Sequence, residues 1–233
     1  FLAIEDRAAE GKIRAVLERE IDAAGRSALV DLWRHLAERT EWGYFGPDPV
    51  ARRIHHVLAR ILMHPGSALL GMEHVAAVAG RPVVLLPNHL SYADANVVEL
   101  LLDRAGAEEL AGRMTIIAGP KVFVDLQRRF SSLCFGTVRT PQSSGRSSEE
   151  AVMSPRDVAR AARDSIAAAH ERLALGDALL VFGEGTRSRT GTMQPMLPGV
   201  ARYFEGRDAL LLPVGITGTE AAFPVGEDRL HPV

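Results

Sequence analysis

Apolar residues recur at helical spacing along the first third of the chain. Three amphipathic stripes carry this pattern, over residues 13–21, 29–36 and 54–62. Gly25 and the turn-rich segment 42–49 separate the stripes, because glycine and proline interrupt helices. The pattern therefore predicts an N-terminal helical region over residues 1–78.

From residue 80 onward, short apolar runs alternate with helical stretches. Strands are expected over residues 82–86, 114–118, 136–139, 178–182 and 210–216. Helices are expected over residues 94–102, 124–133 and 155–175. This alternation is typical of an α/β domain whose largely parallel central sheet is flanked by helices, here over residues 79–233.

The last of these helices has clear start signals. It follows a polar, serine-rich stretch over residues 141–153, which we expect to be a loop. Ser154 suits the N-cap, Pro155 the first helical position, and Asp157 the positive end of the helix.

Composition and charge narrow the classes of function. Of the 233 residues, 47% are hydrophobic, which is enough for a sizeable core. The formal net charge is −2, so no global field attracts nucleic acid and any anion site must be local. The single cysteine, Cys134, excludes an internal disulfide and argues against a thiolate metal cluster, so we expect a reducing compartment and no metal.

No apolar run approaches the roughly 18 residues that a membrane span needs, and no signal peptide is visible. The chain begins at Phe1 and stops soon after a strand-like run, so we expect that both ends are trimmed, with a truncation at the C-terminus. The missing membrane anchor is therefore not taken as a sign of a soluble native protein. The expected location is the cytoplasm, with peripheral contact at the inner face of the membrane. The N-terminal helices either pack as a bundle or present Arg52, Arg53 and Arg60 to anionic headgroups or an acidic carrier protein.

His89 and Asp94 form the first candidate chemical group. They lie in the segment Asn88–Asp94, directly after an expected strand and before an expected helix, where ligands bind in open α/β sheets. Imidazole titrates near neutrality and suits general-base work, and Asp94 is placed to fix its tautomer. One such His–Asp spacing is expected by chance in this composition, so a helix-capping Asp94 beside an incidental histidine stays an alternative.

A second candidate follows the strand expected at 178–182. Gly183 and Gly185 flank Glu184, which favours a tight backbone cup with outward-facing amides. Thr186 adds a hydroxyl, and Arg187 and Arg189 add guanidinium groups that match phosphate oxygens. The alternative is a surface turn with solvated arginines.

Three further residues are weaker candidates. Arg139 ends one expected strand and Lys121 follows another, so each either points into the same crevice or is an ordinary solvated charge. Ser91 lies two residues from His89, but no glycine-flanked nucleophile elbow presents it. A histidine base with an anion clamp implies activation of a hydroxyl on a phosphorylated acceptor.

Four pieces of the chain, in the same order, resemble the glycerophospholipid acyltransferase family, which includes glycerol-3-phosphate and lysophosphatidic acid acyltransferases. They are Asn88-His89-x4-Asp94, Gly136-Thr-Val-Arg139, Phe182-Gly-Glu-Gly-Thr-Arg187-Ser188 and Leu212-Pro-Val-Gly-Ile216. The resemblance covers about residues 82–216, and its first and third pieces are the specific ones. Gly183 stands where the family usually has proline, and the Arg139 block is shorter than usual.

The resemblance implies a role for each matching position. His89 is the general base and Asp94 its partner. Arg139, Arg187 and Arg189 hold the acceptor phosphate, with Lys121 as a further candidate. Gly183, Glu184, Gly185 and Thr186 shape the acceptor pocket or stabilise the oxyanion. The helical first third resembles the layout of the soluble, plastid-type glycerol-3-phosphate acyltransferases.

The resulting expectation is an O-acyltransferase of phospholipid biosynthesis. It moves a fatty acyl group from acyl-CoA or acyl-carrier protein to a hydroxyl of glycerol-3-phosphate or a lysophospholipid, without metal or cofactor. Three alternatives stay open: a lysophosphatidate-specific enzyme, a non-catalytic lipid-binding relative, and a serine hydrolase that uses Ser91.

Overall fold

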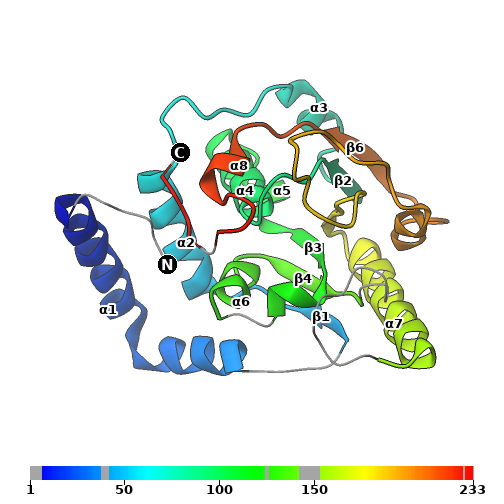
Figure 1. Cartoon of the computed structure of the whole chain (residues 1–233), viewed down its shortest axis with the longest axis horizontal. Coiled ribbons are helices and arrows are strands. Elements are labelled where there is room, and N and C mark those ends of the chain that lie inside the picture. The colour runs from blue at the N-terminus through cyan, green and yellow to red at the C-terminus, as the bar shows by residue number, and fades with distance from the viewer. Residues whose placement is uncertain (1–6, 38–41, 124–125, 142–152, 228, 233) are drawn as a thin grey trace.

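A computed structural model describes residues 7–37, 42–123, 126–141, 153–227 and 229–232, and it contains one six-stranded sheet (Figure 1). The strands are β1 (Gly43–Phe45), β2 (Val83–Pro87), β3 (Met114–Ala118), β4 (Gly136–Arg139), β5 (Ala178–Leu180) and β6 (Leu210–Val214). Their order across the sheet is β1-β4-β3-β5-β2-β6. All neighbours pair in parallel except β1, which runs antiparallel to β4 at one edge.

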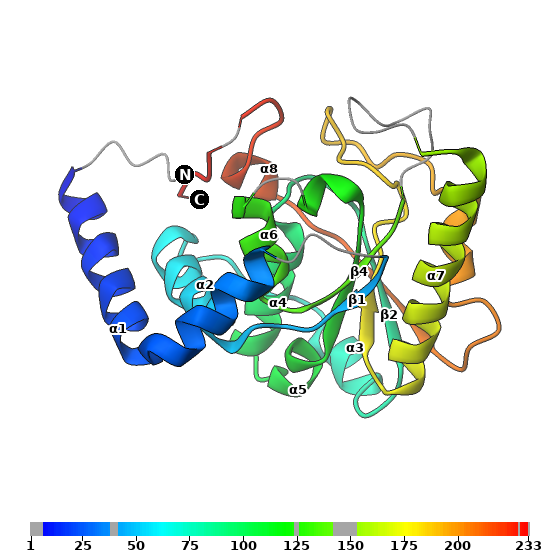
Figure 2. The ribbon, with the colours of Figure 1, turned by 90° about the horizontal axis from the view of Figure 1, so that it is seen from below.

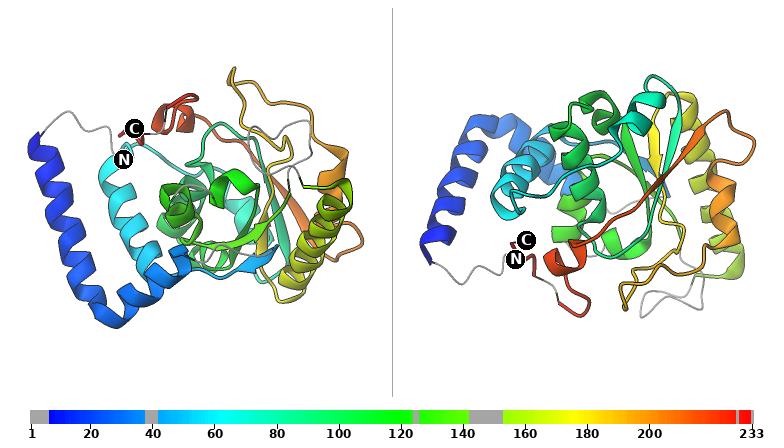
Figure 3. Two further views of the ribbon diagram at one scale, coloured as in Figure 1. Left: turned by 60° about the horizontal axis from the view of Figure 1, so that its bottom comes forward. Right: turned by 90° about the horizontal axis from the view of Figure 1, so that it is seen from above.

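Helices cover both faces of this sheet. The α-helices are α1 (Arg7–Ala37), α2 (Pro49–Leu62), α3 (Met72–Ala77), α4 (Asp94–Arg104), α5 (Glu108–Gly112), α6 (Leu126–Ser132), α7 (Pro155–Ala174) and α8 (Thr219–Ala222). Two 3-10 helices, η1 (Pro120–Phe123) and η2 (Pro198–Tyr203), complete the set. In Figure 2, α7 lies on one side of the strands, whereas α1, α2, α4 and α6 lie on the other. Both views of Figure 3 show the same separation and place the blue helix α1 outermost, beyond α2.

Alternating side chains of the strands fill two hydrophobic cores. On β2, Val83 and Leu85 join the core beneath α2 and α4, whereas Val84 faces the opposite core with Leu173 of α7. Because successive residues of a strand point to opposite faces, strands buried on both faces read as continuous apolar runs. This explains why the sequence showed unbroken hydrophobic stretches, and the expected α/β fold with its largely parallel sheet is confirmed.

The N-terminal region differs from the expectation in one respect. The segment 42–49, predicted as a turn between helices, contains β1, in which Tyr44 pairs with Val138 of β4. The region 1–78 therefore gives a strand to the sheet in addition to its helices. The division into two domains at residue 78 stays a prediction. Gly25 interrupts α1 with φ 76° and ψ 159°, so the glycine expected to separate two helices marks a kink.

Local capping sets where two helices begin. Asp48 caps α2, since its Oδ1 accepts hydrogen bonds from the amides of Val50 (2.8 Å) and Ala51 (3.0 Å). Ser154 caps α7 by accepting from the amide of Asp157 (3.1 Å), as predicted. The loop expected just before Ser154 lies largely outside the described residues.

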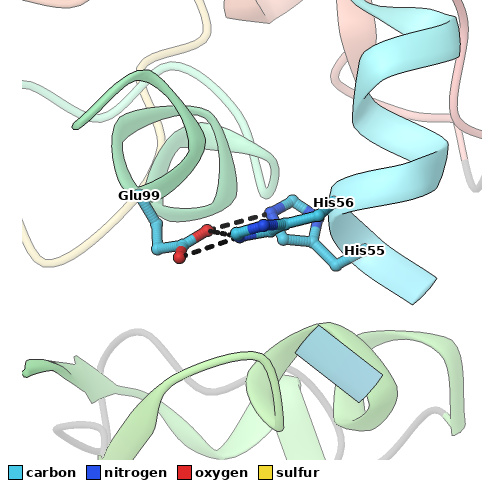
Figure 4. A group of neighbouring side chains, drawn as sticks. All are labelled: His55, His56 and Glu99. Carbon is cyan, nitrogen blue, oxygen red and sulfur yellow. Dashed lines mark hydrogen bonds and ion pairs between the residues drawn. The ribbon is translucent and has the colours of Figure 1, made fainter. Parts of the chain in front are cut away.

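A buried ionic cluster joins α2 to α4, the helix that begins at Asp94 (Figure 4). Glu99 has no exposed side-chain surface, and its Oε1 accepts a hydrogen bond from Arg52 Nη2 at 2.6 Å. His56 Nε2 lies 2.9 Å from Glu99 Oε2, and His55 Nε2 lies 3.4 Å from the same oxygen. Burial raises the pKa of the Glu99 carboxyl, but hydrogen bonds from His55 and His56 outweigh it and lower that pKa from 4.5 to about 2.

Glu99→Gln is expected to destabilise the fold in a pH-dependent manner. Because the folded-state pKa lies below the unfolded value, the contribution of Glu99 is complete above pH 4.5 and is lost as the pH falls toward 2. The shift corresponds to about 3 kcal/mol at neutral pH. Urea unfolding of wild type and variant between pH 7 and pH 3 measures this difference.

Glu73→Gln is the matched control, because the Glu73 side chain is 75% exposed. If the difference in unfolding free energy between wild type and Glu99→Gln stays constant from pH 7 to pH 3, the lowered pKa of Glu99 is contradicted.

Candidate active site at the carboxyl edge of the sheet

The candidate site lies where the carboxyl ends of β2 and β5 meet. These two strands are parallel neighbours, so the loops that follow them leave the sheet side by side. The loop after β2 carries His89, and the loop after β5 carries Arg187. Residues almost a hundred positions apart in the chain are thereby brought to one edge.

His89 and Asp94 form a direct hydrogen bond. Nδ1 of His89 lies 2.8 Å from Oδ2 of Asp94, whose side chain is fully buried at the first turn of α4. A carboxylate accepts, so Nδ1 donates and Nε2 is the ring nitrogen left for other chemistry. The ring of His89 also stacks on Phe182 with centroids 3.9 Å apart, which fixes its plane.

Three more donors hold the Asp94 carboxylate in place. The amides of Leu90 (2.7 Å) and Ser91 (3.0 Å) donate to Oδ2, and the Thr219 hydroxyl donates to Oδ1 (2.5 Å). A buried carboxylate is tolerated only when its oxygens are satisfied in this way. The capping role that the sequence left as an alternative therefore coexists with the contact to His89.

Glu184 ties the two loops together. Its side chain is buried, and it accepts hydrogen bonds from the amide of His89 (2.7 Å) and the amide of Gln194 (2.7 Å). In the reverse direction, the amide of Ser188 donates to the carbonyl of His89 (2.7 Å). The backbone of the histidine is thus held on both sides by the loop after β5.

The site opens into a cavity of about 600 Å³. Its described lining is largely apolar, and the charged side chains in it are Lys121, Arg128, Arg187, Arg189 and Arg202. None of the described lining residues is an aspartate or glutamate. In a chain with a net charge of −2, this local excess of positive charge favours an anionic ligand.

Most of the predicted site residues line this cavity. They are His89, Lys121, Gly185, Thr186, Arg187 and Arg189. Asp94 lies directly behind His89. The roles assigned to these residues stay predictions.

Gly183 and Glu184 were expected to shape the acceptor pocket, but the structure places them elsewhere. Neither lines the cavity; Glu184 lies behind the loop, and a Cβ on Gly183 would come within 2.6 Å of Met196 Cε. The amide of Gly185 donates to the carbonyl of Phe182 (3.1 Å), so it is not the free donor that an oxyanion site needs. Gly185 instead supplies the left-handed turn, with φ 66°.

Arg139 is not among the cavity-lining residues, in contrast to the expectation that it points into the crevice. Its guanidinium carbon lies 4.6 Å from the ring centroid of Trp42 and 5.1 Å from that of Phe123. Both rings lie within cation–π distance of the guanidinium group. A phosphate-binding role for Arg139 stays a prediction without support from this geometry.

Sequence reasoning assigned no role to several residues that organise the site. Asn88 exchanges two hydrogen bonds with the backbone of Ile216, donating at 3.0 Å and accepting at 2.7 Å, which joins the ends of β2 and β6. Thr219, Tyr92 and Arg128 were also not singled out. For Tyr92 a signal existed, because it lies inside the segment between His89 and Asp94.

The serine-hydrolase alternative finds no supporting contact among the described residues. The Ser91 hydroxyl accepts from the amide of Ala93 (3.2 Å), and the described hydrogen bonds include none between Ser91 and His89. Among the described residues, His55, His56 and Glu99 have ligand atoms within 4.8 Å of one another, the arrangement that a metal site needs. Arg52, 2.6 Å from Glu99, already neutralises that carboxylate and opposes a cation there. Burial raises the pKa of the Cys134 thiol, which leaves it unreactive.

Comparison with known proteins identifies the family to which the chain belongs. The model of the Acyltransferase family matches residues 69–217, more than half of the chain. The chain therefore belongs to the Acyltransferase family, which confirms the family resemblance and identifies the protein as an acyltransferase. A search of curated proteins gave no match.

Among solved structures, the chain is similar to the 1-acyl-sn-glycerophosphate (LPA) acyltransferase, PlsC, from Thermotoga maritima. The sequences are 18% identical, the match covers 86% of this chain and 71% of that chain, and the TM-score is 0.49. Within the described residues, no helix has the length and apolar character needed to cross a bilayer.

Glu184→Gln is expected to loosen the His89 loop, because an amide group cannot accept at both oxygen positions. One backbone amide then faces an NH2 group, and losing a charged hydrogen bond of this kind costs about 2 kcal/mol. Urea unfolding measures the loss of stability. Glu205→Gln is the control, because Glu205 is exposed. Equal stability of the two variants would contradict the bridging role of Glu184.

Proposed function

We propose that the protein transfers a fatty acyl group from the thioester of acyl-CoA or acyl-carrier protein to a hydroxyl of a glycerol-phosphate acceptor, in phospholipid biosynthesis. The observation that carries the proposal is the His89–Asp94 hydrogen bond at a cavity whose described charged lining is entirely basic. The acceptor is glycerol-3-phosphate or a lysophospholipid.

His89 is the general base in this mechanism. Nδ1 is engaged by Asp94, so Nε2 takes the proton from the acceptor hydroxyl while that oxygen attacks the thioester carbon. The imidazolium that forms is stabilised by the adjacent Asp94 carboxylate. When the tetrahedral intermediate collapses, the carbon–sulfur bond breaks and His89 returns the proton to the leaving thiolate. The reaction proceeds without a covalent acyl-enzyme, since the described hydrogen bonds of His89 include none to a side-chain hydroxyl or thiol.

Basic side chains orient the acceptor. Arg187, Arg189 and Lys121 line the same cavity as His89 and are the proposed phosphate ligands. An oxyanion needs N–H groups that are not already in use. The following amides already donate hydrogen bonds within the protein: His89, Leu90, Ser91 and Gly185. The proposal therefore moves this role to the Thr186–Arg187 backbone or the Thr186 hydroxyl, which lie at the exposed tip of the loop.

The apolar part of the cavity suits the acyl chain. Leu58 and Leu62 of α2 and Phe223 beside α8 are examples of its described lining. Because substrate and product are lipids, we also propose that the protein works in the cytoplasm, in peripheral contact with the inner face of the membrane. The reaction uses the acyl thioester as co-substrate and needs no metal.

An acceptor panel decides between the remaining alternatives. Glycerol-3-phosphate, lysophosphatidate and water are offered with one acyl-CoA, and products are identified by mass spectrometry. Acylated glycerol-3-phosphate or phosphatidate identifies the acceptor. Free fatty acid alone favours the hydrolase, and binding without any product favours a non-catalytic relative.

His89→Ala is expected to lower kcat by about 10²- to 10⁴-fold, because it removes the general base while leaving the cavity open. Release of free thiol from acyl-CoA in the presence of acceptor measures this loss.

His74→Ala is the matched control, since the side chain of His74 is 72% exposed and lies away from the cavity. Thiol release by His89→Ala at a rate near that of wild type would contradict the mechanism.

A further inference from the structure

Tyr92 contacts two of the arginines that line the cavity. The guanidinium carbon of Arg187 lies 3.7 Å from the centroid of the Tyr92 ring, and that of Arg128 lies 4.6 Å from it. Both distances are within the range of a cation–π interaction. Arg187 comes from the loop after β5 and Arg128 from α6, so one ring gathers cations from two distant segments.

The Tyr92 ring is itself fixed relative to the catalytic histidine. It lies in the short segment between His89 and Asp94, whose backbone is held by the Asp94 carboxylate. The ring makes a T-shaped contact with the ring of Phe223, with centroids 5.7 Å apart. The position of the two guanidinium groups is therefore tied to the position of His89.

Two like charges lie beside one ring, in a cavity whose described lining residues include no carboxylate. Such a local concentration of positive charge attracts an anionic ligand. Arg187 gives a second sign of this, because its Nη1 is buried and has no hydrogen-bond partner within the described part of the chain. A buried guanidinium nitrogen of this kind lacks the acceptor that it needs.

We propose that Tyr92 is a positioning residue that presents Arg128 and Arg187 together as a site for the phosphate monoester of the acceptor. This inference rests on the proposed acyl transfer to a phosphorylated acceptor and adds Arg128 to the phosphate ligands. Arg128 was not suspected from the sequence, since it lies inside a helix with no motif around it.

The distances suit one phosphate group. The two guanidinium carbons lie at most about 8 Å apart, the sum of their distances to the ring centroid. Guanidinium N–H groups that reach past the same edge of the ring can donate to one phosphate, because its oxygens accept from several donors at once. A phosphate monoester of the acceptor fits better than a phosphate of coenzyme A. Only the glycerol backbone separates the acceptor phosphate from the reacting hydroxyl, whereas the whole pantetheine arm separates the phosphates of coenzyme A from its thioester.

The experiment compares Tyr92→Leu, Tyr92→Phe and Arg128→Gln with wild type in two arms. The first arm measures the Kd of sn-glycerol 3-phosphate, of short-chain lysophosphatidate and of coenzyme A by calorimetry, which needs no turnover. The second arm measures KM and kcat for the preferred acceptor. Arg104→Gln is the control, because Arg104 is exposed at the end of α4 and does not line the cavity.

Tyr92→Leu and Arg128→Gln are each expected to weaken binding of the phosphorylated acceptor by about tenfold and to raise its KM by a similar factor, with a smaller change in kcat. Tyr92→Phe keeps the ring and is expected to restore binding. The double variant Tyr92→Leu/Arg128→Gln is expected to bind little worse than Tyr92→Leu, since loss of the ring already displaces Arg128. Binding of coenzyme A and the Arg104→Gln control stay at wild-type values.

Unchanged acceptor binding in Arg128→Gln and Tyr92→Leu overturns the inference, as does a loss confined to coenzyme A. Weak binding in Tyr92→Phe also overturns it, because the ring alone is assigned the positioning role. Circular-dichroism melting checks that each variant folds. If Tyr92→Leu does not fold, Arg128→Gln alone still decides the test. If phosphate binding depends on Tyr92 but no acyl transfer occurs, the proposed function fails while this site stands.

Discussion

The buried carboxylate of Asp94 accepts four hydrogen bonds, and the arrangement of the site depends on them. The imidazole of His89, the amides of Leu90 and Ser91, and the Thr219 hydroxyl all donate to it. A carboxylate with no exposure is costly to bury unless such donors are present, so the loop conformation and the histidine tautomer are selected together. The same group thus shapes the turn into α4 and orients the proposed general base.

The parallel sheet supplies the second constraint. Because β2 and β5 are neighbours, the loops after them share one edge, and Glu184 joins these loops through the amides of His89 and Gln194. Asn88 makes an equivalent link to the end of β6. Polar side chains buried between loops therefore do structural work here, while the cationic side chains remain at the cavity. The groups that hold the histidine are therefore different from the basic groups that line the cavity.

Much of the fold was readable from the sequence because burial on both faces leaves continuous apolar runs. The expected bounds of β3 and β4 agree with the structure, and α7 begins at its predicted cap. The strand β1 was missed because three residues within a glycine- and proline-rich segment carry no periodic signal; its pairing with β4 supplies the stabilisation. The hydrogen bond between His89 and Asp94 was expected because both residues lie in one short segment between a strand and a helix, although their spacing alone is no more frequent than chance.

The remaining features depend on residues that are distant in the chain. Thr219 reaches Asp94 across 125 positions, and Arg128 meets Tyr92 only because α6 packs over the same edge. Arg139, a weak candidate for the crevice, contacts Trp42 and Phe123 and is not among the described residues that line the cavity. No local pattern encodes such contacts, because they are set by tertiary packing.

The tautomer of His89 tests the central claim most directly. Long-range proton–nitrogen NMR of the ¹⁵N-labelled protein, with His89→Gln to assign the signals, distinguishes protonated from unprotonated ring nitrogens. Where the imidazole is neutral, the account predicts a protonated Nδ1, bonded to Asp94, and an unprotonated Nε2 facing the cavity. A neutral His89 with its proton on Nε2 would contradict it, because that nitrogen would then be unable to accept the proton of an acceptor hydroxyl.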